Sequence, residues 1–426
     1  MTTTLDALLA GIDGGRMAGT VSALAEAPFA GRRAGSPGGN AARDWLSEQL
    51  RGLGAEPAAD PFPVRAVPEV YAVPEITWSD GTDTRRLAFG RQAAVHLASA
   101  DVPAARRGQV AVAGAGDPVG RWLLVPAGMS LFDAYGHGDG ALGLLIGRPV
   151  DADGWQYTML AGPDPGPLPV LTLDPDTYAA MFAAAPTGLA WLAGNTPIRR
   201  ADVTAANLHG HCRTASGRSP DLLLTAHYDG VGDHPGLRQP AAADNGSGVA
   251  VVLEAARVLA PVLPDGAGFA VGLLDAEEIG ALGSAHHAAR LRRAGAAPQV
   301  VNVDGAGQLH EAAAVEAGGP AHRLLAVLDQ AGRHTGLPLA AGPVASDNRR
   351  YAAAGLAAVG IGAGMGAYHS PADTPDRVDT ATLVAVCRLV VATVWLAATT
   401  PAARSAGHRP SPDMTDSSSL QDRSLS

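Results

Sequence analysis

Several common features are missing from this sequence of 426 residues, and each absence narrows its interpretation. Lysine does not occur, so the 31 basic residues are all arginine; because alanine and glycine are so abundant, we attribute this to coding composition and not to function. Aromatic residues make up only 4% of the chain, so alanine, valine and leucine must fill most of the core. Acidic residues outnumber basic ones, and the net charge of -10 argues against a nucleic-acid partner, because few positive charges remain to neutralise phosphate groups.

Cysteine and long apolar segments are also scarce. Cys212 and Cys387 lack the spacing of a metal site and need not form a disulfide, so we expect two free thiols in a reducing compartment. No run of about 18 uninterrupted apolar residues is present, which argues against an ordinary transmembrane helix and a membrane partner. The start, MTTTLDALLAGIDGG, lacks a basic stretch followed by an apolar one, so we expect no signal peptide and a cytoplasmic location.

The sequence divides into regions of different character. Residues 40–53 carry apolar side chains at helical spacing and precede Gly54, which predicts a helix that ends there. The middle third is rich in proline and glycine, and its short apolar runs predict a β-rich module with strands at 109–113, 121–125, 142–146 and 169–173. The predicted boundaries are 1–62 for the N-terminal part of the main domain, 63–205 for the inserted module, 206–400 for the rest of the main domain and 401–426 for a disordered tail.

From Asp221 onward, apolar strand-like segments alternate with helix-like segments. The predicted strands are DLLLTA (221–226), FAVGLLDA (269–276), VVNVD (300–304) and LAAVGI (356–361), and a helix is expected after each. Such alternation predicts an α/β fold with a mostly parallel sheet flanked by helices on both faces.

Acidic residues and histidines lie where these predicted strands end. In an open α/β sheet, ligands bind beyond the carboxyl ends of the strands, so we expect these side chains to meet on one rim. The set comprises His227, Asp229, Asp244, Glu277, Glu278, Asp304 and His369.

Five members of this set suit zinc, which accepts imidazole nitrogen and carboxylate oxygen: His227, Asp244, Glu278, Asp304 and His369. Three carboxylates with two imidazoles are too many for one zinc ion but suit two ions that share a carboxylate. Two dications also offset the repulsion between Glu277 and Glu278 and leave Glu277 to accept a proton from the attacking water. Asp229 is placed to accept the second N–H of His227, and Tyr368 to donate to an oxyanion, although a tyrosine can also simply pack at a pocket edge.

Five sequence blocks in a fixed order resemble the co-catalytic di-zinc aminopeptidases typified by bacterial leucyl aminopeptidase, to which glutamate carboxypeptidase II is related. The blocks are TAHYDG, AADNGSGVAVVLE, DAEEIGALGS, VNVDGAG and AYHSPADT. The resemblance covers about residues 207–398 and the lead-in AGRRAGSPGGNAA, and it implies the three-layer sandwich of zinc exopeptidases. The middle module resembles the protease-associated domain that several relatives carry as an insertion. Residues 230–242 form a longer segment than is usual in the family, which we expect to reshape one wall of the pocket.

The resemblance also implies a role for each candidate residue. His227, Asp244 and Asp304 would bind one zinc ion, and Asp244, Glu278 and His369 the other, with Glu277 as general base, Tyr368 as transition-state donor and a cis peptide bond between Asp244 and Asn245. The predicted function is therefore a zinc-dependent metallo-exopeptidase, preferably an aminopeptidase, with two zinc ions per chain and peptides as substrates. A carboxypeptidase or dipeptidase of the same family, or an inactive peptidase-like binding protein, remains as an alternative, and the oligomeric state is left open.

Overall fold

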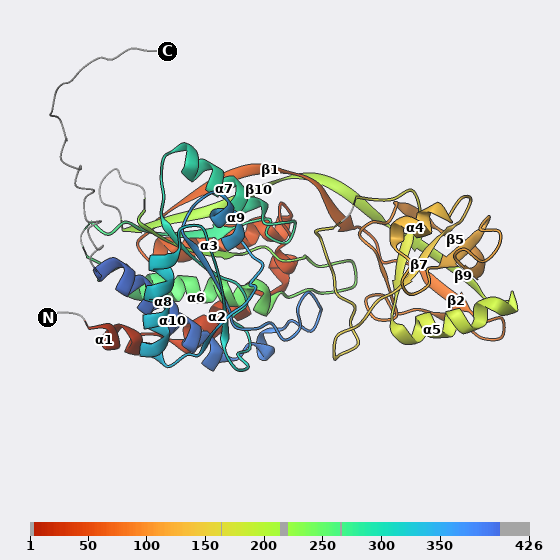
Figure 1. Cartoon of the computed structure of the whole chain (residues 1–426). Coiled ribbons are helices and arrows are strands. Elements are labelled where there is room, and N and C mark those ends of the chain that lie inside the picture. The colour runs from red at the N-terminus through yellow and green to blue at the C-terminus, as the bar shows by residue number, and fades with distance from the viewer. Residues whose placement is uncertain (1–3, 163, 214–219, 265, 401–426) are drawn as a thin grey trace, which may run out of the picture.

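The computed structural model describes residues 4–162, 164–213, 220–264 and 266–400, and within them the chain forms two eight-stranded sheets (Figure 1). The expected disordered tail lies outside the described residues. The strands of the first sheet are, in spatial order, β1 (Glu56–Val70), β10 (Ile198–Arg213), β12 (Phe269–Leu274), β11 (Leu222–His227), β13 (Gln299–Val303), β16 (Ala358–Gly362), β14 (Ala313–Gly318) and β15 (Leu339–Ala341).

The centre of the first sheet is parallel and its flanks are mixed. Strands β12, β11, β13 and β16 run parallel to one another, and they coincide with the four strands expected from the sequence. On either side the pairs β1–β10, β10–β12 and β14–β16 are antiparallel. The predicted α/β fold is confirmed. The antiparallel strands were not foreseen; β14, for example, is half exposed and lacks a continuous apolar run.

Helices cover both faces of this sheet in three layers. Within β11, Leu222 and Leu224 pack in the core under α6 (Gly248–Leu259), α8 (His322–Thr335) and α10 (Thr380–Thr399), as alternating strand residues point to opposite faces. Leu223 packs in the other core, under α7 (Leu282–Arg293) and α9 (Asn348–Ala353). The helix expected at 40–53 is present as α3 (Pro37–Gly52).

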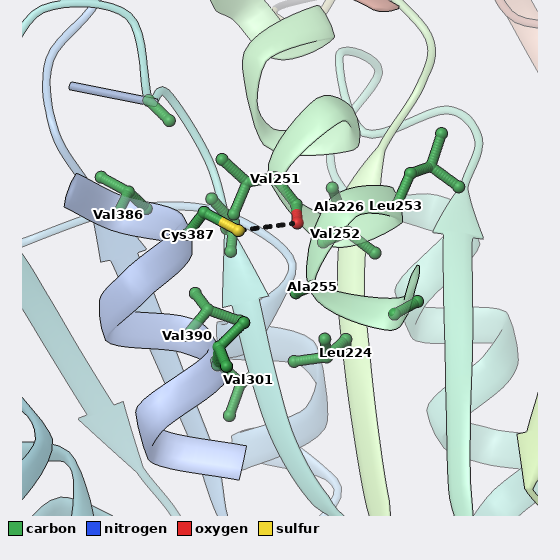
Figure 2. Packing of buried hydrophobic residues seen from close by; sticks show 14 of the residues in the cluster. Leu224, Ala226, Val251, Val252, Leu253, Ala255, Val301, Val386, Cys387 and Val390 are labelled. Atoms are coloured by element: carbon green, nitrogen blue, oxygen red, sulfur yellow. Dashed lines mark hydrogen bonds between the residues drawn. The ribbon is translucent and has the colours of Figure 1, made fainter. Parts of the chain in front are cut away.

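Helix α10 is the most apolar element of the main body. It is long and apolar enough to cross a membrane by length and composition, although its sequence includes Arg388. However, 61% of its most apolar window is buried inside the protein, where Val386 and Cys387 lie against α6 (Figure 2). The Cys387 thiol points at the carbonyl oxygen of Val251, at 3.9 Å. The helix is packed as a core helix, and Cys212 and Cys387 are both free, as predicted.

The second sheet has its own core and is reached through β1 and β10. Its strands are, in spatial order, β3 (Thr84–Arg86), β2 (Ile76–Ser79), β9 (Trp191–Thr196), β5 (Val102–Val112), β6 (Arg121–Leu124), β7 (Gly143–Gly147), β8 (Val170–Leu173) and β4 (Ala93–Val95). The four strands expected between 109 and 173 are therefore present, together with the helices α4 (Leu131–Gly136) and α5 (Pro175–Ala184).

Strands β1 and β10 form a long two-stranded ribbon that arches from the main body to the second sheet (Figure 1). Their pairing runs from Glu56 opposite His211 to Val70 opposite Ile198. The interpretation of residues 63–205 as a protease-associated-like insertion stays a prediction.

Candidate metal centre

The expected rim at the carboxyl ends of the central strands brings all five candidate ligands together. His227 is the last residue of β11, Asp304 directly follows β13, and Glu278 lies four residues beyond β12. Asp244 precedes α6, and His369 lies in the loop after β16. All five side chains are buried, which places them beneath the surface of the rim.

The first group of ligands surrounds His227. Its Nε2 atom lies 3.3 Å from Oδ1 of Asp244 and 3.4 Å from Oδ1 of Asp304. One ligand atom from each of the three residues lies within 4.8 Å of the other two. This is a compact set of one imidazole and two carboxylates, which zinc accepts.

The second group shares Asp244 with the first. Nε2 of His369 lies 3.1 Å from the other oxygen of Asp244, Oδ2, and 2.7 Å from Oε2 of Glu278. These three residues also bring one ligand atom each within 4.8 Å of one another. Asp244 thus turns one oxygen toward each group, as a bridging carboxylate between two metal ions would.

The chemistry of these atoms fits a pair of cations. Nε2 of His227, Oε1 of Glu278 and Oδ1 of Asp304 are buried without a hydrogen-bond partner among the residues that the structure describes. Burial raises the pKa of Glu278 to about 7, with Asp244 adding to the effect. Burial alone lowers the pKa of His227, but the surrounding carboxylates, with Asp304 first, raise it well above its ordinary value. Several carboxyl groups thus share one buried site, and bound dications would offset their mutual repulsion and satisfy the unpaired atoms.

The carboxylate of Asp229 is fully buried behind His227 and Glu277. Its Oδ1 lies 3.5 Å from Nδ1 of His227, while the backbone oxygen of Asp229 is closer, at 3.2 Å. Its two side-chain oxygens accept hydrogen bonds from the backbone N–H groups of Glu277 (3.1 Å) and Glu278 (3.2 Å). Asp229 therefore orients the backbone of the paired glutamates as well as the ring of His227.

Glu277 is half-buried beside the two groups, and Tyr368 lies at their edge. Burial raises the pKa of Glu277 well above its usual value, and the nearby Asp347 acts in the same direction. The Tyr368 ring is 41% exposed and stacks on His369, with 3.6 Å between ring centroids. Burial of its hydroxyl and the carboxylates of the site raise the pKa of Tyr368, so the hydroxyl keeps the proton that it would donate.

Two residues that support the bridging aspartate were not among the sequence candidates. Asp373 accepts hydrogen bonds from the backbone N–H groups of Ala243 (2.7 Å) and Asp244 (3.0 Å). The fully buried Arg32 donates to the backbone oxygens of Leu24, Tyr228, Pro240 and Ala241. Asp373 lies in the motif AYHSPADT and Arg32 in AGRRAGSPGGNAA. The motifs therefore include both residues, but the motifs alone assign neither of them a function. The peptide bond between Asp244 and Asn245 is cis, as the resemblance implies.

A segment from the second sheet also reaches the metal centre. Met159 places its sulfur 3.3 Å from Nδ1 of His369, and the backbone N–H of Thr158 donates to the carbonyl oxygen of His369 (2.9 Å). The hydroxyl of Ser370, next to this ligand, donates to Asp151 (2.7 Å). The segment around residues 151–160 therefore closes one side of the site.

Part of the chain is similar to known peptidases. Residues 207–394 match the model of peptidase family M28. Aminopeptidase YwaD of Bacillus subtilis (strain 168) is 41% identical over 85 residues, which is 20% of this chain and 17% of that protein.

Two solved structures share the fold over nearly the whole chain. An aminopeptidase from Aneurinibacillus sp. strain AM-1 superposes with a TM-score of 0.68 at 21% identity, covering 92% of this chain and 95% of its own. BSAP, a zinc aminopeptidase from Bacillus subtilis, superposes with a TM-score of 0.70 at 22% identity, covering 91% and 95%.

Proposed function

We propose that this chain is a zinc-dependent aminopeptidase that removes N-terminal residues from peptides and uses two zinc ions; the match of residues 207–394 to the model of peptidase family M28 supports this. One observation carries the proposal: Asp244 directs Oδ1 toward His227 and Oδ2 toward His369, so that two three-residue ligand groups share it. The name of the solved zinc aminopeptidase from Bacillus subtilis supports the choice of metal.

The charge of the site favours an amine end of a peptide over a carboxylate end. Six carboxyl groups lie in or against the two ligand groups, and in their ionised form they outnumber the positive charges of two zinc ions; they belong to Asp229, Asp244, Glu277, Glu278, Asp304 and Asp347. A negative field attracts an N-terminal ammonium group and repels a C-terminal carboxylate. This argument favours an aminopeptidase over a carboxypeptidase of the same family.

The residues of the chain divide the chemistry among them. Bound zinc ions polarise a carbonyl group and lower the pKa of water. Glu277, whose carboxyl would be ionised beside two bound dications, accepts the proton of the attacking water and passes it to the leaving amine. Asp229 fixes the backbone from which Glu277 projects. Tyr368 keeps its phenolic proton and donates a hydrogen bond to the oxygen that becomes negative in the transition state.

The experiment compares substrates on the zinc-loaded full chain. Amino-acyl anilides and peptides with a free N-terminus should be hydrolysed, whereas N-blocked dipeptides should not. Hydrolysis of N-blocked dipeptides alone would indicate a carboxypeptidase instead. No hydrolysis by protein that has bound zinc would leave an inactive peptidase-like binding protein as the better description.

Replacement of the proposed base separates chemistry from metal binding. Glu277→Ala should lower kcat by about 10²–10⁴-fold, the usual contribution of a positioned base, with zinc content equal to that of the wild type. The exposed Glu26→Ala serves as a control and should keep full activity. If Glu277→Ala retained most of its activity, another group would have to be the base.

A further inference from the structure

A cleft beside the metal centre combines residues of the second sheet with residues of the main body. The cleft opens to solvent and is lined by both parts of the chain. Met159 and Thr158, which contact His369, line it, and so do His234 and Leu237 of the long segment 230–242. The cleft is therefore continuous with the segment that closes one side of the site.

Two hydrogen-bond donors face each other inside this cleft. Nδ1 of the buried His96 accepts a hydrogen bond from the backbone N–H of Ala98 (3.1 Å), so a neutral ring must carry its proton on Nε2. Nε2, however, lies 2.8 Å from Nη2 of Arg148, which is also a donor. A doubly protonated ring would add a further donor, whereas a ring protonated on Nδ1 would accept from Arg148 but leave the N–H of Ala98 without its acceptor.

The positive charge of Arg148 is also unbalanced. Within the described part of the chain the Arg148 side chain forms no ion pair, and its one hydrogen-bond partner is His96. Glu69 lines the same cleft, but Arg33 and Arg199 already bind its two oxygens, at 2.7 and 2.6 Å. A guanidinium group with no carboxylate partner in an enclosed cleft is a preferred binding group for an anionic ligand.

We propose that Arg148 and His96 form a subsite for a carboxylate of the substrate, which makes short peptides with a free C-terminus the preferred substrate class. The inference rests on the peptidase function proposed above. An acidic side chain of a peptide offers the same chemistry, and the test separates the two sources. The electrostatics agree, because the acidic metal centre attracts the amine end of a short peptide while Arg148 attracts its other end.

The test measures binding, so that it does not depend on turnover. Di-, tri- and tetra-alanine, each as free acid and as C-terminal amide, are titrated calorimetrically into the zinc-loaded Glu277→Ala protein. At the best length the free acid should bind about tenfold more tightly than the amide, since hydrogen bonds to charged groups are the strong ones. The same titrations with an amidated peptide that carries Asp or Asn at its last position identify a side-chain carboxylate as the source.

Variants assign the preference to Arg148. Arg148→Gln in the same background should bring the ratio of acid to amide affinity close to one, Arg148→Lys should keep part of it, and the exposed Arg86→Gln should keep all of it. A preference for the Asp-containing amide that Arg148→Gln abolishes supports the subsite with a side-chain ligand. Equal binding of acids and amides together with equal binding of the Asp and Asn amides, or a preference unchanged in Arg148→Gln, overturns the proposal. Failure of the wild type to hydrolyse any peptide would instead overturn the proposed function.

Discussion

The carboxylate of Asp373 accepts a hydrogen bond from the backbone N–H of Asp244 at 3.0 Å. The two side-chain oxygens of Asp244 in turn face the two ligand groups. A second hydrogen bond, from the N–H of Ala243 at 2.7 Å, fixes the preceding residue. Asp373 is only 2% exposed, so water cannot replace it as an acceptor. The position of the shared ligand thus depends on a residue that itself need not touch metal.

We therefore predict that Asp373→Ala weakens zinc binding and the fold together. Loss of two hydrogen bonds to a buried charged group should lower the free energy of unfolding by about 3 kcal/mol. Urea unfolding of the zinc-free protein and a competition titration with a chelator measure the two effects. Asp376→Ala, three residues away and exposed, provides the control, and an unchanged zinc affinity in Asp373→Ala would contradict the supporting role.

Replacement of the shared ligand should have a larger effect than replacement of an unshared one. Asp244→Ala should remove both zinc ions, whereas Asp304→Ala should leave the ion held by Asp244, Glu278 and His369. Zinc content after dialysis, measured by mass spectrometry, distinguishes the two outcomes. Retention of one tightly bound zinc in Asp244→Ala would show that the two groups do not depend on one carboxylate.

Asp229→Asn should affect the site through its geometry. The amide can accept only one of the two hydrogen bonds from the backbone N–H groups of Glu277 and Glu278. We expect zinc affinity to fall by about 10–100-fold, as is usual for residues that orient metal ligands, and kcat to fall as well. The exposed Asp329→Asn controls for loss of a charge, and equal zinc affinity in wild type and Asp229→Asn would rule out the proposed effect.

A buried histidine outside the metal centre, His287, should make the folded protein less stable as the pH is lowered. His287 lies between the ring of His209, 4.2 Å away, and the Tyr351 hydroxyl, 2.9 Å from its Nδ1, with Asp60 and Arg290 nearby. Burial, with a smaller effect of His209, lowers the pKa of His287 to about 2. As the pH falls below about 6.5, this histidine takes up a proton in the unfolded chain but stays neutral in the folded protein. The free energy of unfolding therefore decreases as the pH is lowered.

Replacement of His287 should make the free energy of unfolding less dependent on pH. The loss attributable to His287 is about 1.4 kcal/mol per pH unit once its unfolded form is charged, and His287→Gln should lack it. Urea unfolding of chelated protein at several values between pH 7 and pH 5 gives the two slopes, with the exposed His322→Gln as control. Parallel curves for wild type and His287→Gln would show that this ring does not titrate as described.

The parts of the fold that the sequence predicts are those with a local signal. Strands β11, β12, β13 and β16 are short apolar runs, and three of them end at or just before a motif residue, so the central sheet and the meeting of the five candidate ligands at its edge were foreseen. Strand β14 was missed because its side chains are half exposed and give no clear periodicity.

The supporting residues of the site depend on contacts that no local pattern encodes. Met159 is separated by 210 positions from His369, which it contacts, and Arg32 by 196 positions from Tyr228. A buried arginine that donates only to backbone oxygens, and a methionine beside a histidine, have no characteristic spacing. Only the fold shows that Met159 contacts His369 and that Arg32 binds the backbone next to His227.

Val70 and Ile198 face each other at the far end of the β1–β10 ribbon, so the second sheet is inserted between two paired strands. The chain leaves and returns at neighbouring positions, and a hairpin turn of about two residues can join them without a change of register. All five zinc ligand candidates lie outside residues 71–197, so such an excision leaves them in place and removes Met159 and Arg148. The ribbon therefore allows the second sheet to be removed or exchanged as a single unit in an engineered variant.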